Sequence, residues 1–157
     1  MRNLAVLFVS LFLGLFLTHT VSAAEVASRE ECIAMCKAAA KMIAENKAAG
    51  IAEVGKPKGK FVWKDSYVFL MDKSGKMLAH PFSPQLLKKD SLLADTDYNK
   101  VKPKKIFVEF VDVAFKNGEG WVDYKWPKPD KKIPSDKFTF IYRVGWTDMF
   151  VGAGTYK

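Results

Sequence analysis

The feature that most restricts the fold is a set of five short strand-like runs joined mainly by turns, without regularly alternating crossover helices. The runs cover residues 67–71, 77–80, 121–126, 138–144 and 149–156. Strands linked by short turns pair antiparallel, whereas neighbouring parallel strands need a long crossover that is usually helical. We therefore predict an α+β domain in which a mostly antiparallel five-stranded sheet packs on helices.

Two segments carry helical signals. Ser28 and Glu31 form a capping-box pattern, and apolar residues then recur at spacings of three and four from Cys32 to Ile43, with Gly50 as the expected end. A second helix is expected to begin at Pro103, to carry an apolar stripe over residues 106–114 and to end at 117–118. Residues 81–101 are irregular.

The N-terminal residues have the features of a secretory signal peptide. Arg2 is followed by an apolar run from Leu4 to Leu17 and by small residues around Ala23 that suit cleavage. The run is short of the roughly 20 residues that a membrane span requires. We predict a signal peptide over residues 1–24 and one sensor domain over 25–157, periplasmic or secreted, with no stable membrane span after cleavage. If uncleaved, the run would act as an anchor.

The positive charge of the chain comes almost entirely from lysine. Lysines make up 22 of the 25 positive residues and are spread from Lys37 to Lys157. Proteins that read nucleic acids usually cluster arginines on one surface, so we predict a solvated lysine surface and no nucleic-acid partner. Weak attraction to acidic polymers or anionic lipid is the alternative.

Histidine content limits the chemistry. His80 is the only histidine outside the predicted signal peptide, so a site of several histidine ligands is excluded and we expect neither metal nor cofactor.

Four segments in order carry a family resemblance. Residues 67–72 (YVFLMD), 75–81 (GKMLAHP), 120–127 (GWVDYKWP) and 151–156 (VGAGTY) resemble single Cache domains, the extracytoplasmic sensing modules of bacterial chemoreceptors and histidine kinases. The resemblance implies a long N-terminal helix and a PAS-like five-stranded sheet, with a helical segment between the second and third strands covering a small ligand. Known ligands of the family are mostly small organic acids such as acetate, propionate, lactate or pyruvate.

No membrane helix or signalling domain follows the Cache-like segment. We therefore expect a free-standing exported member of the family that passes its signal to a membrane-bound receptor or histidine kinase.

Two residues are candidate donors to a carboxylate. His80 ends the second strand-like run, where an imidazole can donate to a bound anion. Its alternative role is structural, as a partner of a loop carbonyl. Arg143 lies inside a strand, and its planar guanidinium suits bidentate carboxylate binding. Its alternative role is a salt bridge on the outer face.

Aromatic residues two apart share one face of a strand and can wall a pocket. Tyr67 and Phe69 have this relation in the first strand, as do Tyr124 and Trp126 in the third. Ordinary core packing is the alternative. The predicted ligand site comprises Tyr67, Phe69, His80, Tyr124, Trp126 and Arg143. A hollow plugged by side chains, with His80 and Arg143 both in bulk water, would contradict it.

The two cysteines are a disulfide candidate. Cys32 and Cys36 lie one helical turn apart, which allows sulfur contact but is awkward for relaxed disulfide geometry. Export favours a disulfide, and we predict one, with buried free thiols as the alternative.

The sequence contains no evident nucleophile or matched acid–base pair. We therefore predict a module that binds a small organic acid without catalytic turnover. One alternative is a hydrolase built on His80 with Asp72, Asp123 or Asp148, and another is a module that docks an envelope protein.

Overall fold

The computed structural model describes residues 25–129 and 131–157, and the predicted signal peptide lies outside them. The elements in chain order are α1 (Arg29–Glu45), α2 (Lys47–Val54), β1 (Val62–Trp63), β2 (Ser66–Asp72), β3 (Met77–Ala79), the 3₁₀ turn η1 (Leu86–Lys88), α3 (Ile106–Asp112), the π-helical turn η2 (Val113–Asn117), β4 (Glu119–Pro127), β5 (Pro134–Arg143) and β6 (Met149–Tyr156). This order confirms the predicted α+β class.

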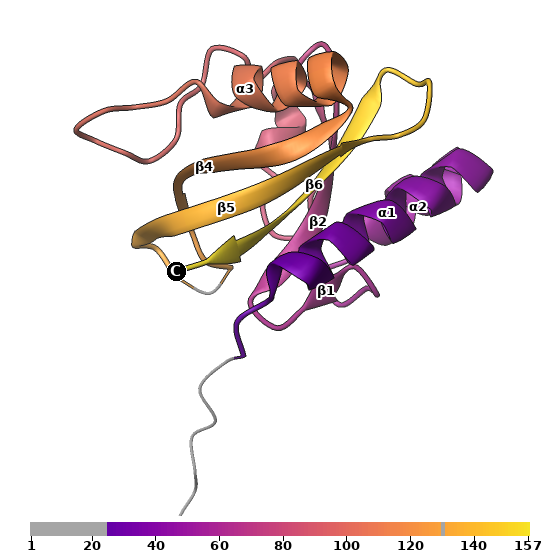
Figure 1. The fold of residues 1–157 in the computed structure, drawn as a ribbon, viewed down its shortest axis with the longest axis horizontal. Helices are drawn as coiled ribbons and strands as arrows, with labels where there is room; N and C mark the ends of the chain where they lie inside the picture. The colour runs from indigo at the N-terminus through magenta and orange to yellow at the C-terminus, as the bar shows by residue number, and fades with distance from the viewer. Residues whose placement is uncertain (1–24, 130) are drawn as a thin grey trace, which may run out of the picture.

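All strands belong to one antiparallel sheet, shown in Figure 1. The strand order is β1-β2-β6-β5-β4, and β3 pairs with β2 off this path. The five predicted strands are present, together with the two-residue β1. Strand β5 begins at Pro134, four residues before its predicted start, and this shift changes which side chains reach the site.

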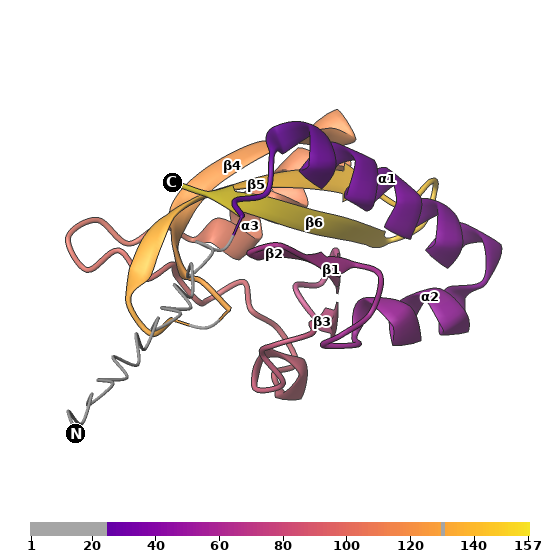
Figure 2. The same ribbon diagram turned by 90° about the horizontal axis from the view of Figure 1, so that it is seen from below.

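Helix α1 packs on one face of the sheet (Figures 1 and 2). The capping box at its start is formed as predicted, since Ser28 Oγ accepts from Glu31 N and Glu31 accepts from Ser28 N. Its buried side presents small residues to the sheet, among them Cys36 and Ala39. Small side chains let the helix lie close to the strands, where it covers Val68, Leu70, Val151 and Ala153.

The prediction that Gly50 ends the first helix is wrong. Asn46 adopts an extended conformation with φ −148° and breaks the helix, and its side chain accepts a hydrogen bond from Ala49 N to cap α2. Gly50 instead lies inside α2 against α1. A Cβ added there would come within 2.6 Å of Ile43 Cγ1, so only glycine permits this close packing of the two helices.

The opposite face of the sheet is covered by α3, η1 and the loops between β3 and β4 (Figure 1). Helix α3 starts at Ile106 rather than at the predicted Pro103, and the helical run ends at Gly118 with φ 82°, as predicted. Phe107 and Phe110 point from α3 onto the sheet. This face therefore holds a second core between sheet and cover.

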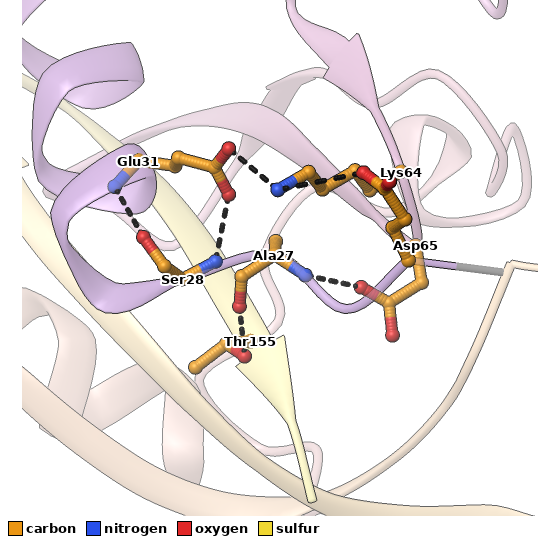
Figure 3. A network of polar contacts seen from close by, with 7 residues as sticks. Ala27, Ser28, Glu31, Lys64, Asp65 and Thr155 are labelled. Atoms are coloured by element: carbon orange, nitrogen blue, oxygen red, sulfur yellow. Dashed lines mark hydrogen bonds and ion pairs between the residues drawn. The ribbon is translucent and has the colours of Figure 1, made fainter.

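The start of α1 is tied to the end of the sheet by the polar network in Figure 3. Asp65 accepts from Ala27 N, and Thr155 donates to Ala27 O. Lys64 pairs with Glu31 at 2.7 Å. These contacts hold residue 27 beside both the β1–β2 turn and the last strand. None of the helices in the described ranges is long and apolar enough to cross a membrane.

Candidate ligand-binding site

The site is built from alternate residues of the strands that face α3. Tyr67 and Phe69 point to this side of β2, and Tyr124 and Trp126 point to it from β4. Together with His80, three of these side chains line one small cavity under α3 and η1, whose lining is Tyr67, Phe69, Met77, His80, Leu86, Ile106, Phe107, Phe110 and Trp126. Tyr124 lies next to it, 5.4 Å from Phe110 and 6.0 Å from Trp126 between ring centroids.

His80 is buried and has a defined tautomer. Its Nδ1 accepts hydrogen bonds from Phe82 N at 3.1 Å and Ser83 N at 3.0 Å, so the neutral ring carries its proton on Nε2. The ring centroid lies 4.8 Å from that of Tyr67. Burial, and then the positive charge of Lys137, lower the pKa of His80 to about 3. His80 is therefore a neutral donor, and Nε2 has no hydrogen-bond partner among the described residues.

Lys137, which the sequence analysis did not select, is the cation of this face. It is 1% exposed, and its Nζ donates to the Tyr67 hydroxyl at 3.1 Å. The ammonium also lies 4.2 Å from the Tyr67 ring centroid and 4.7 Å from that of Tyr156. No carboxylate in the described parts of the chain pairs with it. An ammonium removed from water normally has a partner charge, so this arrangement is suited to receive an anion.

Two glycines of β6 make room on this face. A Cβ at Gly154 would come within 2.4 Å of Lys137 Cε, and one at Gly152 within 2.3 Å of Phe69 Cζ. The lysine stem and the phenyl ring therefore lie directly against the strand backbone. On the other face of β6, Val151 and Ala153 pack against the α1 side.

The aromatic cavity is almost filled by the protein's own side chains. Its volume is about 10 Å³, close to the least space that holds one water. An open groove of about 510 Å³ lies outside it and shares Leu86, Phe107 and Trp126 with its wall. A second groove, of about 340 Å³, is lined by Tyr124 and Lys137 together with residues of the neighbouring strand ends. Binding a small molecule here thus requires these wall residues to move. His80 and Lys137 are both buried behind them.

Arg143 does not join the other predicted site residues. Its Nε donates to Thr147 O at 3.2 Å, and its guanidinium lies 4.7 Å from the centroid of the Phe115 ring. It shares strand parity with Lys137, but six residues of extended strand separate the two by about 20 Å. Arg143 therefore stabilises the β5–β6 turn at the other end of the sheet.

Cys32 and Cys36 are both free thiols in this structure, which is the alternative to the predicted disulfide. They lie in a regular helix, and Cys36 Sγ donates to Phe140 O at 3.6 Å. Burial raises the pKa of Cys32 to about 11 and that of Cys36 well above its usual value. Both therefore serve as small core side chains.

The elements of a hydrolase are not assembled. His80 Nδ1 is occupied by backbone donors, so no aspartate orients the ring. Asp72 accepts from the turn at residues 74–76, Asp123 pairs with Lys104, and Asp148 pairs with Lys73. Within the described ranges, no three acidic, cysteine or histidine side chains form a possible metal site.

A Cache domain family model matches residues 51–157. The chain belongs to the Cache domain family. Cache sensor domains are ligand-binding modules without catalytic activity, and the structure has the fold that the resemblance implied. The match begins within α2, so α1 lies outside it.

Similar proteins support this assignment. The methyl-accepting chemotaxis protein McpP of Pseudomonas putida is 33% identical over 93 residues, which cover 59% of this chain and 16% of McpP. The chain thus spans only a small part of that relative. A periplasmic sensor domain of a chemotaxis protein is 26% identical, with a TM-score of 0.63, and the match covers 81% of this chain and 88% of that one.

Two further structures have the same fold at 21% identity, each over 81% of this chain. One is described as the structural basis for carboxylic acid recognition by a Cache chemosensory domain, with a TM-score of 0.69 and 91% of that chain covered. The other is a methyl-accepting chemotaxis protein from Vibrio parahaemolyticus, with a TM-score of 0.65 and 86% covered.

Proposed function

We propose that this Cache domain acts in the periplasm, after removal of residues 1–24, and binds a small organic acid between its sheet and α3. The ligand carboxylate pairs with Lys137 and accepts a hydrogen bond from His80 Nε2. Tyr67, Phe69 and Trp126 contact its short apolar part. A membrane-bound receptor or histidine kinase receives the signal.

The observation that carries the proposal is the burial of Lys137 without an acidic partner among the described residues. A buried ammonium without a partner charge is destabilising, and an anion with a matching hydrogen-bond pattern relieves that penalty. His80 is held in its neutral state by the same surroundings, which keeps its proton on the nitrogen left without a protein partner. The described carboxylic acid recognition by a structural neighbour agrees with this choice of ligand class.

The ligand enters the cavity by displacing the wall between the cavity and the outer groove. Leu86, Phe107 and Trp126 separate the filled cavity from the outer groove, and Leu86 belongs to the short turn η1. Displacement of η1 exposes the cavity while the sheet stays in place, because the strands are paired along their length. Ligand binding then stabilises a rearranged cover.

The test is a thermal-shift screen of acetate, propionate, lactate and pyruvate against their amides. The amides keep the shape and lose the charge, so only the acids should stabilise the protein. A ligand present at 100 times its Kd adds about 2.7 kcal/mol, an increase in Tm of roughly 10 °C for a chain of this size. The ligand should be recovered unchanged. Equal shifts with acids and amides, or consumption of the ligand, would disprove the proposal.

Two substitutions of His80 separate its contacts. His80→Asn keeps an acceptor near Nδ1 and removes the distal donor, whereas His80→Gln keeps a donor near Nε2 and removes the Nδ1 acceptor. We expect the asparagine variant to remain folded and to lose about tenfold in affinity for the acid. The glutamine variant should retain more affinity. It should lower the stability of the fold, because the N–H groups of residues 82 and 83 lose their acceptor. The reverse pattern would assign His80 a structural role alone.

A further inference from the structure

One end of the molecule combines lysines with exposed aliphatic tips. In both Figure 1 and Figure 2 the loop before α3 and the turn between β4 and β5 lie at the same end as the C-terminus. Val101 is 96% exposed at the first loop, and Ile133 is 79% exposed at the second. We call this surface the lysine-rich end and define it by Lys100, Val101, Lys102, Lys105, Lys132 and Ile133.

Hydrogen bonds and a ring contact join the loop before α3 to the end of β4, where the β4–β5 loop begins. Tyr98 N donates to Lys125 O at 3.1 Å, and the Tyr98 ring lies 5.0 Å from that of Trp126, at the end of β4. Lys125 N in turn donates to Asp97 Oδ2 at 2.9 Å. The loop before α3 is thus fixed to the end of the sheet from which the β4–β5 loop extends.

The acidic residues described at this end are engaged by other groups than the four lysines that define it. Asp97 is buried and accepts from backbone donors, while Asp123 pairs with Lys104 and Asp136 with Lys125. Lys100, Lys102, Lys105 and Lys132 form no ion pair with any residue that the structure describes. The exposed aliphatics therefore lie within a field of unpaired cations.

The chain enters the domain at this same end. Asp65 accepts from Ala27 N at 3.0 Å, as Figure 3 shows. It also accepts from Lys128 Nζ at 2.9 Å, so the entering chain lies beside the β4–β5 loop. The sequence that precedes it, residues 1–24, carries the apolar run of a leader or anchor. The segment that carries this run is therefore connected to the domain at the lysine-rich end.

We propose that the lysine-rich end docks against the anionic headgroups of a phospholipid bilayer. Lys100, Lys102, Lys105 and Lys132 pair with lipid phosphates, and Val101 and Ile133 enter the interfacial layer. Short aliphatic tips flanked by cations match this layer, since charge attracts the surface and apolar side chains prefer its inner part. A soluble polyanion would use the lysines and leave the aliphatics in water. The ligand site under α3 is not part of this surface.

The test uses the full chain with a bimane dye on Val101→Cys and, as its counterpart, on Trp146→Cys at the opposite end. Cys32 and Cys36 are buried, so the new thiol is labelled selectively. Vesicles of phosphatidylcholine are compared with vesicles containing about a third phosphatidylglycerol. We expect the dye at 101 to shift to the blue only with phosphatidylglycerol, to be quenched by a nitroxide lipid, and to return to its aqueous spectrum in high salt. The dye at 146 should keep its aqueous spectrum under all of these conditions.

Matched charge variants test the surface itself. In the Val101→Cys background, K102Q/K132Q should weaken docking by about 25-fold, at roughly fivefold per lysine near an anionic surface. K47Q/K58Q removes the same charge at the α2 end and should change it less than twofold. A dye at 101 that stays aqueous on anionic vesicles overturns the proposal, as do equal losses from the two double variants. Retention on heparin without a blue shift on vesicles would overturn it in favour of a soluble polyanion.

Discussion

The two faces of the sheet are both buried, but they are built from different side chains. The α1 face contains mainly small and aliphatic residues such as Ala39, Val68 and Leu70, with fewer buried aromatic rings, Phe61 and Phe140. The α3 face is aromatic and also buries His80 and Lys137. Burying apolar side chains stabilises the folded state, whereas burying an unpaired cation lowers its stability. The comparison agrees with the proposal above, in which the first face maintains the fold and the second binds the ligand.

Glycine placement in β6 reinforces the difference. Val151 and Ala153 fill the α1 face, while Gly152 and Gly154 leave space on the α3 face for Phe69 and Lys137. The same strand therefore provides bulk to one layer and clearance to the other. If the two faces are separable, a substitution on one face should leave the property of the other face unchanged.

The largest effect is expected from Leu70→Ala on the α1 face. Leu70 is fully buried, so the truncation should lower the free energy of unfolding by about 3 kcal/mol and Tm by about 10 °C. The thermal shift produced by a saturating acid ligand should persist in the variant, as measured by differential scanning fluorimetry. Loss of that shift in a folded variant would show that the faces are coupled.

The pH dependence of stability should come next in size. Because the pKa of His80 falls from about 6.5 in the unfolded chain to about 3 in the folded one, the unfolded state takes up a proton first as the pH drops below 6.5. Stability is complete above that pH and is lost progressively down to pH 3. Between pH 8 and pH 5 the loss attributable to His80 is about 2 kcal/mol.

Urea unfolding at several pH values checks this dependence. His80→Asn lacks the titrating ring, so its stability should change less between pH 8 and pH 5. Subtracting the two profiles removes the contribution of the carboxylates, which titrate in both proteins at lower pH. Parallel profiles for the two proteins would contradict the assignment.

Lys137→Met should have a smaller effect on stability and the opposite sign. The variant keeps an unbranched side chain one atom shorter and removes the buried charge, so the unliganded protein should gain about 1 kcal/mol despite losing the hydrogen bond to Tyr67. The acid-induced thermal shift should disappear at the same time. Lys47→Met, on the surface of α2, should change neither quantity. A destabilised Lys137→Met variant that still responds to acid would disprove the binding role.

The fold was largely predictable because its signals are local. Strand alternation, the capping box at Ser28 and the stop at Gly118 each depend on residues close in sequence. The helix break at Asn46 was missed because Gly50 is also a good terminator, and only the packing of Gly50 on Ile43 shows why glycine is needed inside α2.

The site was predictable in part. Parity paired Tyr67 with Phe69 and Tyr124 with Trp126, and the structure places both pairs on the α3 face. Arg143 was chosen for its guanidinium, and it lies at the far end of the sheet. Lys137 was missed because β5 was expected to begin one residue after it. An earlier strand start places residues 137, 139, 141 and 143 on the same face, so the alternation of β5 contained the signal. The depth of burial that distinguishes Lys137 from the other lysines depends on contacts between β2, β5 and β6.

The smallest effect concerns the thiols of the α1 face. Since Cys32 and Cys36 are free and buried, adding a reductant should leave Tm unchanged, and the native protein should react with a thiol reagent far more slowly than the unfolded one. The raised pKa values of both thiols act in the same direction, because the thiolate is the reactive form. A protein recovered from an oxidising compartment with a mass lighter by two hydrogens, and without reactive thiols after denaturation, would contradict this. Such a disulfide would also place a redox-active bond in the α1 face, which otherwise serves only in core packing.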